Sequence, residues 1–526
     1  MRPLLFNLIV FTVISLQIFG HLYARESQRP SDKRPNIILI MTDDHARQAI
    51  SSYGSKINQT PNIDRLANEG IRFENSFVTN AICAPSRAVI LTGKYSHLNG
   101  LKDNRDVFDA KQVTFPLLLQ QAGYQTAMIG KWHLKTLPRG FDIWKILPGQ
   151  GDYYNPCFIE GGDTTRYEGY VTDLITDFSI QTLDQFDRDK PFCLLYFHKA
   201  PHRNWMPDEK HLTMYDDVDI PLPETFFDDY ETRSAAAREQ DMQVIDLYNS
   251  WDMKLHLAVG EEMYSGGSKS YKASAPTAWS NAYKAMTDEQ RAAWDAAYDP
   301  KNKAFREANL SGAELAKWKY QRYIKDYLRC VASVDDNIGR LLDYLDEKGL
   351  AENTIIIYTS DQGFFLGEHG WYDKRFMYEE SMGMPLIVRY PKEISPGTKS
   401  GQLVLNLDFY PTILDYAGIN IPDEVQGESL RSLLKGATPE NWRQSVYYHY
   451  YEYPQGWHDV KKHYGVRTQK YKLIHYYDDI IANEMYDLEN DPNELNNIYG
   501  KAEIRRIQGE LENELVRLRK YYKDND

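Results

Sequence analysis

The chain has 526 residues, of which 42% are apolar and 26% are charged, a composition typical of globular proteins with a buried core. Because 75 acidic residues outnumber 61 lysines and arginines, bulk charge would repel a polyanion, and we expect no nucleic-acid partner. An anionic substrate would need a local cluster of cations or a metal ion. Four cysteines are too few for a disulfide scaffold.

Residues 1–24 have the pattern of a secretory signal peptide. Arg2 precedes a mostly apolar run at 4–19, and Ala24 offers a small residue for cleavage. The apolar run is short for a membrane span, which needs ~20 residues, so cleavage is favoured over a membrane anchor. We expect an exported protein without a membrane span in its mature form. It would be periplasmic or secreted in a bacterium, or lysosomal in a eukaryote.

Residues 25–430 alternate short apolar runs with helical patterns. The runs lie at 36–41, 126–129, 192–197, 355–358 and 386–388. Continuous apolar runs of this length indicate strands that are buried on both faces. We therefore expect an α/β domain with a large, mostly parallel sheet between helices. Residues near 232–325, which are rich in Ala, Trp and Lys, indicate a helical insertion.

Residues 431–526 differ in character and predict a smaller α+β domain. Short Tyr-rich segments at 445–451, 464–467 and 471–476 are separated by turns, which is typical of an antiparallel sheet. The charged segment 502–522 predicts a terminal helix.

Polar side chains follow four of the predicted strands. Asp43 and Asp44 follow the first, Asp361 and Gln362 follow a later one, and two further strands run into Lys/His pairs. Ligands bind at the carboxyl ends of the strands in an open parallel sheet, so these groups should surround one crevice. Three carboxylates and an amide oxygen suit Ca²⁺ or Mg²⁺ better than Zn²⁺. Either acidic pair alone could instead cap a helix or form a turn.

Cys83 stands at the start of a predicted helix that ends at Gly93, with Pro85 in its first turn. A nucleophile or anion at this position would face unpaired N–H groups and the positive end of the helix. Arg87 adds a cation one turn further on. The other three cysteines are expected to be packing residues.

The segment 83–93 matches C-x-P-S-R-x-x-x-L-T-G at every fixed position, and the chain resembles the type I, formylglycine-dependent sulfatases. The resemblance runs from about Pro35 to the C-terminus, through TPNIDRLANEGIRFENSF, GKWH, KAPH, SDQGFFLGEHGWYDK and YGVRTQKYKLI. N-acetylglucosamine-6-sulfatases look most similar. The resemblance implies an alkaline-phosphatase-like sandwich with a smaller C-terminal domain.

The resemblance also implies a cofactor and a metal site. Cys83 would be oxidised to formylglycine by a formylglycine-generating or anaerobic sulfatase-maturing enzyme, and its hydrate would be the nucleophile. The implied ligands of Ca²⁺, with Mg²⁺ as the alternative, are Asp43, Asp44, modified Cys83, Asp361 and Gln362. Many relatives carry Asn or His where Gln362 stands, but Gln also offers a carbonyl oxygen.

Further catalytic roles follow from the same resemblance. Arg87 would hold the formylglycine hydroxyl, and Lys131 and Lys374 would bind sulfate oxygens. His202 would protonate the leaving alcohol, and His133 would remove the proton that allows sulfate to depart. Each histidine, taken alone, could equally be structural.

The implied substrate is a 6-O-sulfated N-acetylglucosamine or N-sulfoglucosamine at the non-reducing end of a glycosaminoglycan such as heparan sulfate. Candidate contacts to this sugar, each of which could instead be a surface charge or part of a salt bridge, are Arg105, His369, Arg375, His463 and Arg467. Three alternatives stay open: a sulfatase for another glycan position, a phosphate or phosphonate monoester hydrolase of the same superfamily, and a non-catalytic carbohydrate-binding protein.

Overall fold

The computed structural model describes residues 34–257 and 275–526 and is built on a ten-stranded sheet. The strand order is β13-β2-β12-β9-β1-β8-β4-β5-β6-β7. Their bounds are β1 Asn36–Thr42, β2 Ile71–Phe73, β4 Gln125–Lys131, β5 Ile143–Leu147, β6 Cys157–Glu160, β7 Asp163–Arg166, β8 Phe192–Phe197, β9 Thr354–Ser360, β12 Leu386–Arg389 and β13 Thr398–Ser400. The five strands from β9 to β5 are parallel, which confirms the predicted sheet type.

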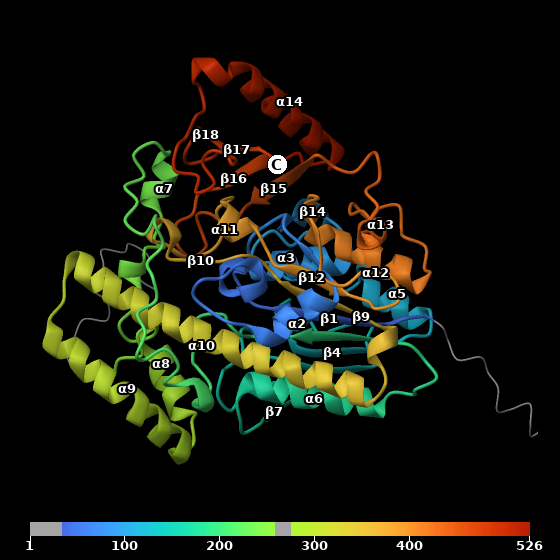
Figure 1. The fold of residues 1–526 in the computed structure, drawn as a ribbon, viewed down its shortest axis with the longest axis horizontal. Helices are drawn as coiled ribbons and strands as arrows, with labels where there is room; N and C mark the ends of the chain where they lie inside the picture. The colour runs from blue at the N-terminus through green and yellow to red at the C-terminus, as the bar shows by residue number, and fades with distance from the viewer. Residues whose placement is uncertain (1–33, 258–274) are drawn as a thin grey trace, which may run out of the picture.

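Helices cover both faces of this sheet (Figure 1). Alternate residues of β1 enter two separate apolar cores, with Ile37 in one and Ile38 in the other, which explains why the strand is apolar at consecutive positions. The first core is completed by α3 (Cys83–Thr92), α5 (Phe115–Gln121) and α12 (Phe409–Ala417), and the second by α2 (Pro61–Glu69), α6 (Val171–Gln185) and α10 (Gly312–Glu347).

The described part of the predicted insertion contains helices joined by turns and irregular segments. Its helices are α7 (Ala235–Glu239), α8 (Ala275–Lys284), α9 (Asp288–Ala308) and the first part of α10. The predicted end of the insertion, at about residue 325, falls inside the 36-residue α10. Buried residues such as Tyr320, Ile324 and Leu328 continue one apolar stripe across that position. Across the described parts of the chain, no helix combines the length and apolarity needed to cross a membrane.

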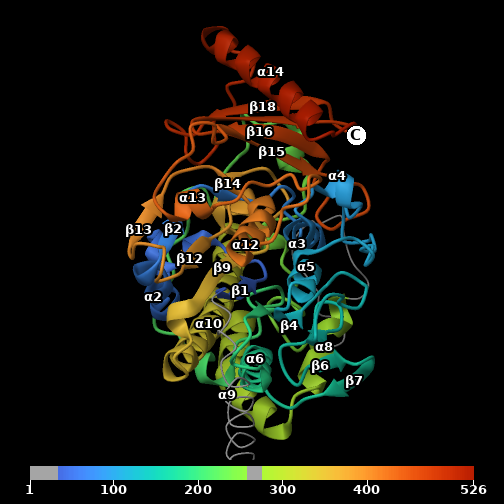
Figure 2. The same ribbon diagram turned by 90° about the vertical axis from the view of Figure 1, so that its right-hand side faces the viewer.

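The C-terminal region forms the predicted antiparallel sheet. Its strands are β15 (Ser445–Tyr450), β16 (His463–Thr468), β17 (Tyr471–Tyr476) and β18 (Ala482–Asp487), paired in chain order. Helix α14 (Arg505–Tyr521) buries Leu511, Leu515 and Leu518. Figure 2 shows the sheet between α14 and the large domain. The shorter elements are β3 Ser76–Phe77, α4 Ser96–Asn99, β10 Phe365–Leu366, β11 Tyr372–Asp373, α11 Glu379–Met382, β14 Val404–Leu405 and α13 Arg431–Leu434. The predicted signal peptide, residues 1–24, lies outside the described residues.

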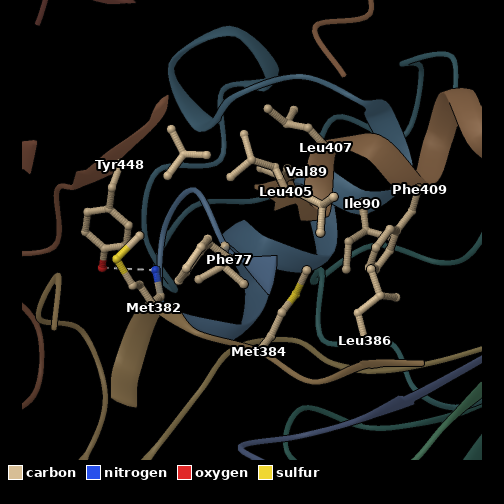
Figure 3. Close-up of a cluster of buried hydrophobic side chains, with 14 of the residues drawn as sticks. Phe77, Val89, Ile90, Met382, Met384, Leu386, Leu405, Leu407, Phe409 and Tyr448 are labelled. Atoms are coloured by element: carbon tan, nitrogen blue, oxygen red, sulfur yellow. Dashed lines mark hydrogen bonds between the residues drawn. The ribbon is translucent and has the colours of Figure 1, made fainter. Parts of the chain in front are cut away.

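The helix that begins at Cys83 rests on an apolar cluster (Figure 3). Val89 and Ile90 of α3 belong to this cluster together with Phe77, the methionines near α11 and residues before α12. Tyr448 of β15 borders it and accepts a hydrogen bond from Ala81 N over 3.1 Å. The segment before Cys83 is therefore anchored to the C-terminal sheet as well as to the main core.

Candidate active site

The carboxyl ends of β1 and β9 bring together the two predicted acidic pairs. Thr42, the last residue of β1, pairs with Ser360, the last residue of β9, so the residues that follow are neighbours. One oxygen each of Asp43, Asp44 and Asp361 lies within 4.8 Å of the others, and all three residues are buried. Burial raises the pKa of Asp44 to about 6, as does repulsion from Asp361, although Lys374 opposes this rise.

The oxygen atoms of this cluster suit a hard cation. Asp43 Oδ1 and Gln362 Oε1 are buried and accept no hydrogen bond within the described chain. Buried acceptors without a partner cost about 1–3 kcal/mol each, and native proteins leave few of them. Carboxylate and amide oxygens are the ligands of Ca²⁺ and Mg²⁺, so the donor set fits either ion. The side-chain nitrogen of Gln362 donates to Asp44 and lies 3.7 Å from Cys83 Sγ.

Cys83 reaches this cluster from the start of α3. The residue is 1% exposed, and burial raises the pKa of its thiol to about 12, with Asp361 and Asp44 adding to the rise and Lys374 opposing it. Arg87, one turn later, donates from Nε to Asp361 Oδ2 over 2.9 Å. Its Nη1 donates to the carbonyl of Lys131. The structure therefore places the predicted nucleophile beside the predicted metal site.

Basic side chains from three other segments face the acidic cluster. Lys131, the last residue of β4, contacts Asp43, and Lys374 Nζ lies 2.7 and 2.8 Å from the two oxygens of Asp44. His202 Nε2 lies 3.8 Å from Asp44 Oδ2. Burial lowers the pKa of the Lys131 amine, even though Asp361 counteracts it.

His133 stands two residues beyond β4 and completes the set. Its Nδ1 is buried and has no hydrogen-bond partner in the described chain. Burial, followed by the charge of Lys131, lowers the pKa of His133 well below its usual value, and burial does the same for His202. Burial therefore disfavours the charged form of both imidazoles.

A cavity of about 520 Å³ opens onto the cluster. Four residues predicted from the sequence line it, namely Cys83, His202, Lys374 and Arg375. The cavity is large enough for a saccharide unit and presents several cations, as an anionic sugar requires. The other predicted residues of the cluster lie beneath this lining and connect to it through the contacts described above. They are Asp43, Asp44, Asp361, Gln362, Arg87 and Lys131.

The five predicted sugar contacts have different positions. Arg375 lines the cavity, where it pairs with Asp373 and Glu452. Arg105 is not part of the lining, although its neighbour Asn104 is, and its guanidinium pairs with Asp103.

The other three lie outside the cavity in internal bonds. The Nδ1 atom of His369 lies 2.9 Å from Asp228 Oδ2, and His463 accepts a hydrogen bond from Met377 N over 3.1 Å. The guanidinium of Arg467 pairs with Glu379. These side chains connect segments of the fold and do not line the cavity. Their contacts match the alternative of an internal bond that the sequence analysis had left open.

Several cavity residues were not predicted from the sequence. Arg203 follows His202 and donates to Asp252 over 2.7 and 2.6 Å, and its guanidinium lies 4.5 Å from the ring centroid of Trp251. Trp457 reaches the cavity from the C-terminal region, with its ring 5.9 Å from that of Trp251. Because these residues come from distant segments without a shared pattern, only the fold reveals them. Lys199 follows β8 and carried a usable signal, since it belongs to one of the Lys/His pairs.

The family models and the relatives that match this chain are sulfatases or a sulphohydrolase. The family model described as Sulfatase matches residues 35–419, and the model described as N-sulphoglucosamine sulphohydrolase, C-terminal, matches residues 367–521. N-acetylglucosamine-6-O-sulfatase of Bacteroides thetaiotaomicron is 54% identical over 505 residues, which are 95% of this chain and 88% of the relative. Human N-acetylglucosamine-6-sulfatase is 27% identical over 80% of this chain and 67% of its own length.

Solved structures share the fold. One that is described as a complex with its substrate D-glucosamine-2-N,6-O-disulfate has a TM-score of 0.89 and 55% identity, and the match covers 94% of this chain and 99% of the other. Phosphonate monoester hydrolase of Agrobacterium radiobacter has a TM-score of 0.67 and 19% identity over 93% of this chain and 96% of its own. That second likeness shows a common fold alone.

Proposed function

This chain belongs to the sulfatase family, and we propose that it hydrolyses the 6-O-sulfate ester of N-acetylglucosamine or N-sulfoglucosamine at the non-reducing end of glycosaminoglycan fragments such as those of heparan sulfate. The main support is the relative at 54% identity, which is an N-acetylglucosamine-6-O-sulfatase. A solved structure at 55% identity holds a glucosamine that carries a 6-O-sulfate. The cation-lined cavity over Cys83 is consistent with this substrate class.

Two groups would complete the site. Asp43, Asp44, Asp361 and Gln362 would hold Ca²⁺, with Mg²⁺ as the alternative, and the ion would supply positive charge against the anionic ester. Cys83 would carry formylglycine, whose hydrate supplies a hydroxyl nucleophile and a second hydroxyl for release of sulfate. The modification would be made by a formylglycine-generating or anaerobic sulfatase-maturing enzyme of the producing cell.

The chain's own cations counter the charge of the ester. A sulfate ester is negative before reaction, so it repels a nucleophile that approaches the sulfur. Lys131 and Lys374 are buried beside the site, where low polarity strengthens their attraction for sulfate oxygens. Arg87 is held by Asp361 and by the Lys131 carbonyl, so it needs little reorganisation during the reaction.

The two histidines move protons. His202 Nδ1 lies 2.7 Å from the carbonyl oxygen of Arg203, so Nδ1 donates to that carbonyl and Nε2 faces the site. To act as the acid, His202 would carry a second proton on Nε2 and pass it to the departing sugar oxygen. His133 has a buried nitrogen without a partner in the described chain, so it can accept the proton that accompanies release of sulfate. Both roles remain assignments from the family resemblance, supported by their position at the site.

The proposed location is outside the cytoplasm. The pattern of residues 1–24 supports export to the periplasm or the medium of a bacterium, with the lysosome as the equivalent in a eukaryote. N-terminal sequencing of the protein from its native host would test this. A start at Met1 or a membrane-bound form would contradict export as a cleaved protein.

Steady-state kinetics on regioisomeric sulfated sugars test the proposed function. We expect the largest kcat/KM for the 6-O-sulfate of N-acetylglucosamine or N-sulfoglucosamine, with weak or no turnover of 2-O-, 3-O- and 4-O-sulfates and of the matching 6-phosphate. Preference for another sulfate position or for the phosphate would contradict the proposal. Protein that carries formylglycine at residue 83 yet releases no sulfate from any sugar would support a binding protein instead.

A further inference from the structure

A second cavity, of about 440 Å³, lies between α9, α10 and the segment that contains Thr213 and Asp216. It shares no lining residue with the catalytic cavity. Four cations line it, namely Lys301, Arg322, Lys325 and Arg329, together with Trp318 and a single carboxylate, Asp216. This excess of positive charge contrasts with the acidic balance of the whole chain.

The carboxylates of the described chain do not neutralise these cations. Asp216 Oδ1 is shared, because it lies 2.6 Å from Arg329 Nη2 and 2.8 Å from Lys301 Nζ. Lys325 has only a 4.0 Å contact with Asp219, whose side chain is 95% exposed, and such pairs contribute little. Arg329 is also paired with buried Asp326.

Arg322 is the most informative of the four. It is only 6% exposed, its Nη2 donates to Asn302 Oδ1 over 2.8 Å, and its Nη1 has no hydrogen-bond partner among the described residues. Its guanidinium lies 4.9 Å from the ring centroid of Tyr298 and 5.3 Å from that of Trp318. These rings hold the guanidinium in the cavity wall, where neighbouring atoms enclose Nη1.

Burial and mutual repulsion both act on the lysines of the cluster. Burial lowers the pKa of Lys301 and of Lys325, and the charge of Arg329 adds to both shifts, although nearby carboxylates oppose them. An anion in the cavity would relieve this repulsion.

We propose that this cavity binds an oxyanion, specifically a sulfate or carboxylate group of an acidic saccharide chain, at a site separate from catalysis. Lys301 and Lys325 are the more exposed cations of the cavity and can donate to such an oxyanion. Arg322 and Arg329 add positive charge from the cavity wall. Trp318 is partly exposed at the cavity and offers an aromatic face for the adjoining sugar. The oxyanion class follows from the cavity alone, whereas a glycan as its carrier rests on the proposed function.

Calorimetric titration with a heparin-derived tetrasaccharide tests this proposal. The full-length Cys83→Ala protein serves as host, so that the ligand is not consumed. We expect a binding event that the double variant Lys301→Gln, Lys325→Gln weakens about tenfold or more, because it removes two charged donors to the oxyanion; tenfold in Kd corresponds to about 1.4 kcal/mol. The matched control Lys303→Gln removes a 76% exposed lysine of the same helix and should bind like the host. Equal binding by host and double variant would overturn the proposal.

Two further arms complete the experiment. Arg322→Gln should lose the same event, and circular dichroism shows whether that buried change still folds; if it does not, the double lysine variant decides. Titration with inorganic sulfate separates the sources of the oxyanion. If inorganic sulfate binds and the double variant abolishes that binding, the ligand is a free anion. If the tetrasaccharide binds and inorganic sulfate does not, the ligand is the glycan. Monosaccharide turnover by the unsubstituted protein is a separate readout, because its absence would contradict the proposed function without affecting these titrations.

Discussion

The Nε atom of Arg87 donates a hydrogen bond to Asp361 Oδ2 over 2.9 Å, although 274 positions separate the two residues in the chain. Their side chains are 1% and 0% exposed. Through this bond the helix that begins at Cys83 is tied to the carboxyl end of β9, where the acidic cluster lies. The second bond of Arg87, to the Lys131 carbonyl, adds the end of β4 to the same unit.

Arg87→Lys should lower kcat/KM on 6-O-sulfated N-acetylglucosamine by about 10²-fold. Lysine keeps the charge but has no planar fork, so it cannot bond to Asp361 and to the Lys131 carbonyl together. The control Arg506→Lys changes an 81% exposed side chain and should leave kcat/KM unchanged. Comparable rates for Arg87→Lys and the control would show that the fork is not needed.

Cys83→Ser should lose sulfatase activity in a host that converts cysteine to the aldehyde, while Cys157→Ser should keep it. Cys157 is a partly exposed residue on β6 and lies outside the cavity lining. Hydrazide labelling of the peptide that contains residue 83 measures the aldehyde directly. Full activity in a protein whose residue 83 remains an unlabelled cysteine would contradict the assignment of the nucleophile.

Removal of divalent cations should abolish turnover, and Ca²⁺ or Mg²⁺ should restore it. Unpaired buried oxygens on Asp43 and Gln362 are the physical reason, because they gain ligand bonds only when an ion is present. Thermal melting should also shift upward with added cation, since binding to the native state alone stabilises it. Asp43→Asn should lose both effects, whereas Asp288→Asn, at a 91% exposed side chain, should retain them. Turnover that persists in chelator would argue against the metal.

His202→Asn should reduce kcat by about 10²- to 10⁴-fold, the range for loss of a general acid. Asparagine can occupy the site but cannot deliver a proton to the leaving oxygen. His211→Asn is the matched control, because His211 lies in a surface helical turn and pairs with Asp336. If kcat stays the same in His202→Asn and only KM rises, the residue positions substrate and is not the acid.

Gly130→Ala should destabilise the protein more than Gly161→Ala. Both glycines have positive φ, of 109° and 59°, which costs an alanine about 1–2 kcal/mol. A Cβ on Gly130 would also overlap the carbonyl of Phe197 on the neighbouring strand, and overpacking adds about 1–3 kcal/mol. At Gly161 a Cβ would meet open space. Denaturant titration gives the two free energies of unfolding; equal losses would mean that β4 and β8 can move apart next to Lys131.

The sequence predicted most of the fold and the chemical centre of the site for clear reasons. Fully buried strands produce uninterrupted apolar runs, and the polar residues immediately after them must meet at one edge of a parallel sheet. Asp43 and Asp361 carried this signal, and the segment around Cys83 carried a family signature. The family model and the relative at 54% identity confirm the sulfatase membership that this signature predicted.

The surroundings of the site were harder to predict. The cavity wall combines Trp251 of the insertion with Trp457 of the C-terminal region, and no local pattern links residues so far apart. His369 and His463 carry the same residue type as the two histidines that we propose to be catalytic, yet the structure holds them in internal bonds. The end of the insertion is hard to place from the sequence for another reason, since a helix that continues into a second packing environment shows no break in its periodicity.

A crystal structure of the Cys83→Ser protein soaked with Ca²⁺ and 6-O-sulfated N-acetylglucosamine tests the central claim most directly. Anomalous difference density should show one cation bound by Asp43, Asp44, Asp361 and Gln362, with the sulfate sulfur next to residue 83 and the sugar in the cavity that His202 and Lys374 line. A cation bound elsewhere, or a sulfate group that points away from residue 83, would contradict the account.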